Sequence, residues 1–109
     1  MGTVELRPAF EGRVVSDFAG DADLGELVEM YVDEMPQRVQ SIIQAYETQD
    51  WELLGRLAHQ TKGAAGSYGF HQITALAESL EHAVRRSGDQ ALIATAFDRL
   101  VDVMKRAEV

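Results

Sequence analysis

The chain contains no cysteine among its 109 residues, which excludes disulfide bonds, thiolate metal sites and cysteine nucleophiles. It also contains no run of 18 apolar residues, so no segment is predicted to span a membrane. No basic segment followed by an apolar one stands at the N-terminus, so no secretory signal is predicted. These absences favour a cytoplasmic protein, and the length predicts one domain over residues 1–109.

Basic residues are scarce, with 10 lysines and arginines against 18 aspartates and glutamates. Residues 1–50 hold 11 acidic and three basic residues, and residues 51–109 hold seven of each, so the whole excess lies in the first half. An acidic chain without a basic stripe is a poor nucleic-acid binder, so no nucleic-acid partner is expected. Most of the acids are interpreted as solvated surface, whereas the neutral second half suits the approach of a negatively charged group.

Motifs of several large enzyme classes are also missing. The chain has no P-loop, no glycine-rich dinucleotide loop and no G-x-S-x-G elbow. Its three histidines, His59, His71 and His82, lack the H-E-x-x-H and Glu-x-x-His patterns of helical metal sites, so no metal site is predicted. His71 and His82 are predicted to be ordinary surface residues.

Apolar residues recur at three- and four-residue steps in four segments, which predicts helices over about 24–48, 51–66, 70–86 and 89–106. Pro36 lies inside the first segment and predicts either two helices or, as we prefer, one helix bent near the proline. No segment shows the alternation of a strand, and the connections are short. The sequence therefore predicts an all-α fold, an antiparallel up-down four-helix bundle.

The bundle is predicted to occupy residues 20–106, after a short N-terminal arm or helix over residues 1–19. Val14, Val15 and Phe18 of this arm are expected to cover one end of the core. Leu24 and Leu27 are among the apolar positions that follow helical spacing in the first segment, and Val84 and Leu92 are predicted to face inward in the third and fourth. Four such helices can close a core by themselves, so a monomer is expected.

The segment 51–66 carries an unusual stripe opposite its apolar face. At 100° per residue, an arc of roughly 100° contains Gly55, His59, Lys62, Gly63 and Gly66. Each glycine inside a helix costs about 1 kcal/mol relative to alanine, so three of them need a physical reason. One reason is close packing of helices, and the other is the close approach of a partner's backbone to the histidine ring.

The pair formed by His59 and Lys62 can support phosphoryl chemistry. An exposed imidazole is largely neutral at pH 7, and one of its nitrogens then carries a lone pair that can act as a nucleophile. Lys62 lies one helical turn further on and can place a positive charge beside a phosphoryl group bonded to that nitrogen. Taken alone, a His-x-x-Lys pair is common on helices and can equally be an incidental surface pair.

With the glycines included, residues 59–70 (His-Gln-Thr-Lys-Gly-Ala-Ala-Gly-Ser-Tyr-Gly-Phe) resemble the signature of histidine-containing phosphotransfer (HPt) domains of multistep phosphorelays. The family has a lysine and a glycine three and four residues after its histidine, small residues after them, and a glycine at the position of Gly69. Residues 76–81 and 31–50 are similar to the helices on either side. Thr61 departs from the pattern, where a large aliphatic residue is usual, and a slightly looser core contact is expected there.

The resemblance implies that His59 is the phosphoacceptor and that Lys62 stabilises the phosphoryl group. It implies that phosphate arrives from, and leaves to, the aspartate of a response-regulator receiver domain, alone or within a hybrid sensor kinase. Mg²⁺ would belong to that partner, and the chain itself would need no cofactor and would have no ATP-dependent kinase activity. Gly55, Gly63 and Gly66 would form the docking surface.

Two other interpretations of the sequence remain open. The chain could be an adaptor that is not phosphorylated and binds a signalling partner through the same face. It could also be a histidine domain that is phosphorylated in trans by an ATP-binding kinase core, because the histidine domain of chemotaxis kinases is similar.

A neighbour of His59 can be estimated from the predicted hairpin. The second and third helices are expected to turn at Tyr68–Gly69, with a positive φ at Gly69. The residue level with His59 is then close to position 78. Glu78, Glu81 and His82 are therefore the candidates to approach His59. A carboxylate, from Glu78 or Glu81, on the other imidazole nitrogen would fix the tautomer and raise the nucleophilicity of the ring.

Overall fold

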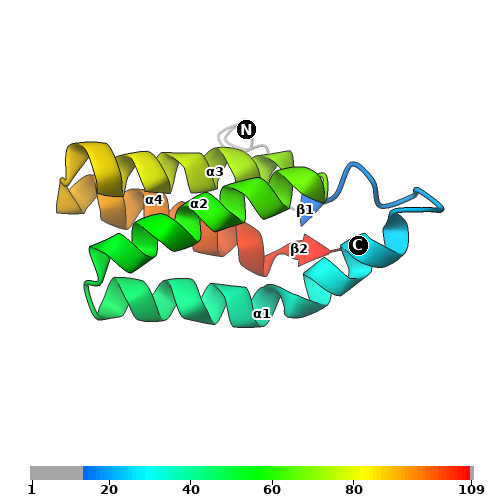
Figure 1. The fold of residues 1–109 in the computed structure, drawn as a ribbon, viewed down its shortest axis with the longest axis horizontal. Coiled ribbons are helices and arrows are strands. Elements are labelled where there is room, and N and C mark those ends of the chain that lie inside the picture. Colours follow the sequence, from blue (N-terminus) through cyan, green and yellow to red (C-terminus); the bar gives the residue numbers. More distant parts are fainter. Residues whose placement is uncertain (1–13, 109) are drawn as a thin grey trace, which may run out of the picture.

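The computed structural model describes residues 14–108 and contains four α-helices with short connections (Figure 1). Its elements in chain order are β1 (Val14–Val15), α1 (Gly25–Glu47), α2 (Trp51–Ser67), α3 (His71–His82), the π-helix η2 (Ala83–Ser87), α4 (Gln90–Lys105) and β2 (Ala107–Glu108). Successive helices run in opposite directions, α1 packs against both α2 and α4, and α3 packs between α2 and α4. The prediction of an all-α, antiparallel four-helix bundle is confirmed.

The first helix is continuous through its proline. Pro36 lies inside α1, which runs unbroken from Gly25 to Glu47. In Figure 1 the N-terminal turns of α1 diverge from the line of the remaining turns. A proline removes one backbone hydrogen bond and crowds the preceding turn, so a bend is less costly than a break when the apolar face continues on both sides. The preference for one bent helix over two helices is therefore confirmed.

Aspartates mark the start of two helices. The side chain of Asp50 accepts a hydrogen bond from the backbone N–H of Leu53, and that of Asp89 accepts from the N–H groups of Ala91 and Leu92. These contacts satisfy amides that have no partner within the helix. The third helix differs from the prediction only in its last turn, because residues 83–87 continue it as a π-helix, and Gly88 at φ 67° ends it.

The core lies between the four helices and is built from the predicted faces. Thr61 is buried among the apolar residues of α2, on the core side of that helix. The prediction that Leu92 faces inward is wrong, because it is 54% exposed, and Leu24 and Leu27, which follow the helical spacing of the first segment, are 36% and 46% exposed. Leu24 and Leu27 lie at the N-terminal start of α1, and Leu92 lines a groove between α3 and α4.

The segment before α1 seals one end of the bundle. Val14 is fully buried, and Phe18 packs partly buried against the core, as the sequence predicted for these two residues. Residues 14–15 also form a two-residue parallel pairing with Ala107–Glu108, which the sequence did not predict. Strands of two residues are too short to show an alternating pattern. The remainder of the predicted arm, residues 1–13, lies outside the described residues.

The segment before α1 also holds the corner between α2 and α3. The Ser16 hydroxyl donates to the carbonyl of Tyr68, and the Asp17 N–H donates to the carbonyl of Gly69. Gly69 is buried and has φ 81°, as the sequence predicted. The ring of Tyr68 stacks on that of Tyr31 in α1 at a centroid distance of 4.6 Å. These contacts join three segments at the corner from which the His59 hairpin extends.

Candidate functional site

His59 lies in the middle of α2 on the outside of the bundle, with 60% of its side chain exposed. Its Nδ1 atom is 3.0 Å from Oε2 of Glu81 in α3. An ionised carboxylate can only accept a hydrogen bond, so Nδ1 must carry the proton in the neutral imidazole. The lone pair then belongs to Nε2, for which no hydrogen-bond partner is found among residues 14–108. The contact therefore leaves an available nucleophilic nitrogen on the exposed side of the ring.

Glu81 holds two cations as well as the imidazole. Lys62 Nζ lies 3.0 Å from Oε1, and Arg85 Nη1 lies 2.7 Å from Oε2. The side chain of Glu81 is 13% exposed, whereas those of Lys62 and Arg85 are 30% and 47% exposed, so these contacts lie at the surface of the bundle. The hydrogen bond from Lys62, with a smaller contribution from that of His59, lowers the pKa of Glu81 below its ordinary value of 4.5. Glu81 is therefore ionised at neutral pH.

The structure identifies which of the three candidates approaches His59. The pairs Gly66–Thr74, His59–Glu81 and Gly55–Arg85 are each in contact, and each is symmetric about position 70. The expected corner at positions 68–69 placed position 78 level with His59, whereas the observed pairs are centred on position 70. Glu81 is consequently level with His59.

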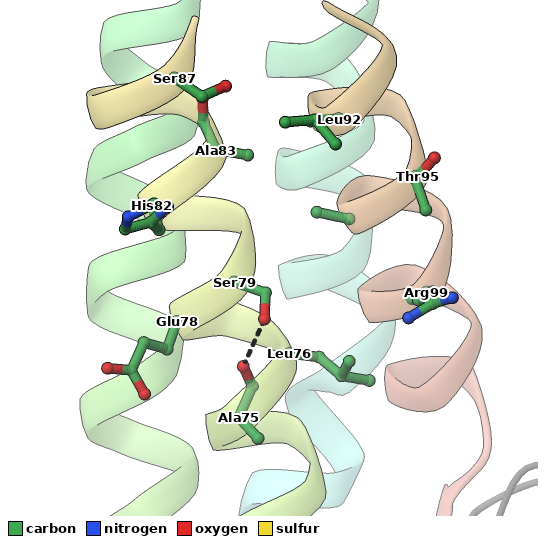
Figure 2. Close-up of a pocket in the computed structure, with 11 residues that line it drawn as sticks. Ala75, Leu76, Glu78, Ser79, His82, Ala83, Ser87, Leu92, Thr95 and Arg99 are labelled. Carbon is green, nitrogen blue, oxygen red and sulfur yellow. Dashed lines mark hydrogen bonds between the residues drawn. The ribbon is translucent and has the colours of Figure 1, made fainter. Parts of the chain in front are cut away.

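Glu78 and His82 do not contact the imidazole. Both side chains are exposed, and Figure 2 shows them extending from α3 on the side away from α4. No ion pair of the Glu78 carboxylate occurs within residues 14–108. Of the two glutamates predicted to orient the histidine, only Glu81 is placed to do so.

The three glycines of the stripe have two different surroundings. Gly63 and Gly66 are exposed beside His59; a Cβ atom on Gly63 would meet nothing within 4 Å, and one on Gly66 would lie 3.5 Å from Thr74 Oγ1. Gly55 is buried, and a Cβ atom there would lie 3.1 Å from Arg85 Nε. The prediction that Gly55 belongs to the exposed docking surface is wrong. Close packing of helices explains this glycine, because the Arg85 side chain crosses the backbone of α2 there.

Arg85 is the residue at this site that sequence reasoning missed. In the sequence it is one of two adjacent arginines near the end of the third predicted helix. Its i, i+4 spacing from Glu81 was visible in the sequence and is typical of a helical ion pair. Its proximity to the imidazole depends on the packing of α2 against α3 at Gly55, which no local pattern indicates.

One other histidine has a carboxylate partner: Nδ1 of His71 lies 3.0 Å from Asp17 Oδ2, but no lysine or arginine pairs with that carboxylate in the part of the chain that the structure describes. Within residues 14–108, no group of three histidine, aspartate or glutamate side chains is placed to hold a metal ion. A groove of about 480 Å³ lies between α3 and α4, but its lining includes none of His59, Lys62 and Glu81 (Figure 2). None of the described helices is both long and apolar enough to cross a membrane.

The fold and the site together define a class of protein: a helical bundle that presents an exposed histidine, with a lysine beside it, on an open helix face. The family model described as "Hpt domain" matches residues 26–108, and the chain belongs to this family of histidine phosphotransfer domains. Comparison with curated proteins found no match, and neither did comparison with solved structures. Family membership places the chain in two-component signalling, with histidine phosphotransfer as its general function.

Proposed function

We propose that the chain is a phosphorelay intermediate that accepts a phosphoryl group on Nε2 of His59 from a receiver-domain aspartate and passes it to another receiver aspartate. The observation that carries the proposal is the contact between Nδ1 of His59 and Glu81, which leaves the lone pair on the exposed nitrogen. The match of the family model supports the same chemistry.

The transfer step is a direct displacement at phosphorus. The Nε2 lone pair forms a bond to the phosphorus of an aspartyl phosphate, and the bond from phosphorus to the aspartate oxygen breaks, with its electron pair left on the carboxylate. Nδ1 keeps its proton, so the imidazole gains one positive charge next to the ionised Glu81. Onward transfer is the reverse step with a second aspartate. Because water also attacks a phosphohistidine, the stability of this adduct matters to the relay.

Lys62 and the exposed glycines complete the proposed roles. The Lys62 ammonium is 30% exposed on the turn that follows His59, where it can pair with phosphoryl oxygens. Gly63 and Gly66 leave the backbone of α2 open beside the ring, so a receiver can bring its aspartate close. Mg²⁺ would be held by the receiver, which also supplies the aspartate that carries the phosphoryl group. The chain itself would need no cofactor.

The donor is tested by offering two sources of phosphate. A receiver domain charged with labelled phosphate is expected to label this chain without ATP or a kinase, and the label should be lost in acid and stable in alkali, as phosphohistidine is. Labelling only by ATP with a kinase core would favour phosphorylation in trans. Binding of receivers without any label would favour the adaptor.

Replacement of Lys62 by alanine is expected to slow transfer from the charged receiver by about 10- to 100-fold, because one positive charge at the transferring group is lost. Rapid-quench measurement of the labelling rate checks this, with Lys105→Ala as the control that removes an exposed lysine from α4. Equal rates for the Lys62→Ala and Lys105→Ala proteins would contradict the role given to Lys62.

A further inference from the structure

One carboxylate at this site has more partners than it needs to orient an imidazole. Glu81 contacts His59, Lys62 and Arg85 at distances of 3.0, 3.0 and 2.7 Å. The contact with His59 uses the same oxygen as the contact with Arg85, and Lys62 takes the other oxygen. Both cations are therefore paired with Glu81 at a site where an incoming phosphoryl group would also attract them.

We infer that Glu81 is an exchangeable counter-ion: when His59 carries a phosphoryl group, Lys62 and Arg85 leave Glu81 and pair with the phosphoryl oxygens. The negative charge of Glu81 thereby keeps the phosphohistidine labile. The inference rests on the proposed function and adds to it what sets the lifetime of the phosphorylated state. Glu81 is a positioning residue in this scheme, since it touches the imidazole at Nδ1 and not the reacting nitrogen.

Counting charges gives the direction of the effect. In the unmodified site, two cations and one carboxylate surround a neutral imidazole, which leaves one net positive charge. Phosphorylation adds a doubly negative group on Nε2, and the ring that keeps its Nδ1 proton gains one positive charge, so the total falls to zero. Glutamine in place of Glu81 would leave one positive charge in the phosphorylated site. The phosphohistidine is therefore more stable with glutamine at position 81 than with glutamate.

Two further effects act in the same direction. Without the carboxylate, Lys62 and Arg85 are no longer held and can pair fully with the phosphoryl oxygens. The Nδ1 proton also loses its anionic partner, and an imidazole that holds this proton less firmly is a poorer leaving group from phosphorus. The glutamine side chain can still accept the Nδ1 hydrogen bond, so the tautomer is retained.

Gly55 makes the position of Arg85 possible. The Arg85 side chain runs across the backbone of α2 at Gly55, where a Cβ atom would lie 3.1 Å from Nε and 3.5 Å from Cγ. The arginine reaches Glu81 from this crossing, and its side chain is still 47% exposed and free to change partners. Removing this cation should act in the opposite direction to removing the carboxylate.

The inference is tested with the labelled, isolated protein and with its transfer equilibrium. The phosphohistidine of the Glu81→Gln protein is expected to have a half-life about fivefold longer than that of the wild type, the size of effect expected for one charge pair at about 4 Å in water. The transfer equilibrium with a receiver should shift toward His59 by a similar factor. Arg85→Ala should shorten the half-life. Glu78→Gln removes the same charge one turn away without a contact to His59, and Arg86→Ala removes the neighbouring arginine; both should stay within about twofold of the wild type.

The outcomes separate this inference from the proposed function. Absence of label on the wild type would overturn the proposed function and the inference with it. A labelled wild type whose half-life equals or exceeds that of Glu81→Gln would overturn the inference alone. A folded Glu81→Gln protein that takes no label would also overturn it, because the carboxylate would then be required for acceptance. A lengthened half-life shared by Glu78→Gln would show a general charge effect and contradict the specific role of Glu81.

Discussion

Labelling from a charged receiver is expected to disappear in the His59→Gln protein, a loss of at least about a thousandfold. Glutamine has a similar size and can hydrogen-bond to Glu81, so the helix and the cluster around Glu81 should persist. Its amide nitrogen has no available lone pair, however, because that pair is delocalised into the carbonyl group. The reaction therefore loses its nucleophile while the site keeps its shape.

The other two histidines are matched controls for this experiment. His71 is exposed at the start of α3, where Nδ1 lies 3.0 Å from Asp17 Oδ2, and His82 is exposed near the end of the same helix. His71→Gln and His82→Gln proteins should be labelled as the wild type is. Label that remained on the His59→Gln protein and disappeared from either control would place the phosphoacceptor elsewhere. Circular dichroism of all three proteins verifies that each is folded.

Among the glycines of residues 14–108, Gly69 is the one whose replacement by alanine is expected to cause the largest loss of stability. The φ of 81° disfavours any residue with a Cβ atom. The added atom would also lie 2.7 Å from Ser16 Oγ, 2.9 Å from Phe18 Cδ2 and 3.1 Å from the backbone nitrogen of Asp17. Strain and overlap together should cost about 3 kcal/mol, which lowers Tm by roughly 10–20 °C in a domain of this size.

A Gly88→Ala protein separates the backbone strain from the steric overlap. Gly88 has φ 67°, but a Cβ atom on it would meet nothing within 4 Å, so Gly88→Ala carries the conformational strain without the overlap. We expect a loss of about 1 kcal/mol for Gly88→Ala. Thermal and denaturant unfolding of both proteins measures the difference, which is the contribution of packing between residues 16–18 and the corner. Equal losses would contradict that packing.

The general architecture could be predicted from the sequence because it depends on local periodicity. The apolar spacing of each segment specified a helix and its buried face, and the short turns specified antiparallel neighbours. Apolar spacing did not reveal that Leu24, Leu27 and Leu92 are exposed, because periodicity does not tell which part of an apolar stripe a neighbouring segment covers. The two-residue strands were missed because their pairing joins residues far apart in the chain.

The candidate site, like the fold, could be predicted from the sequence only in part. The chain by itself determined that His59, Lys62, Gly63 and Gly66 share one helix face, since one helix fixes their relative positions. Only the tertiary structure decided that the partner of His59 is Glu81 rather than Glu78, that Arg85 joins the site, and that Gly55 packs inside the bundle. Each of these depends on the register of α2 against α3, which is set by the three residues at the corner. A shift of one helical turn there exchanges one glutamate for another, and residue spacing along a single helix cannot reveal it.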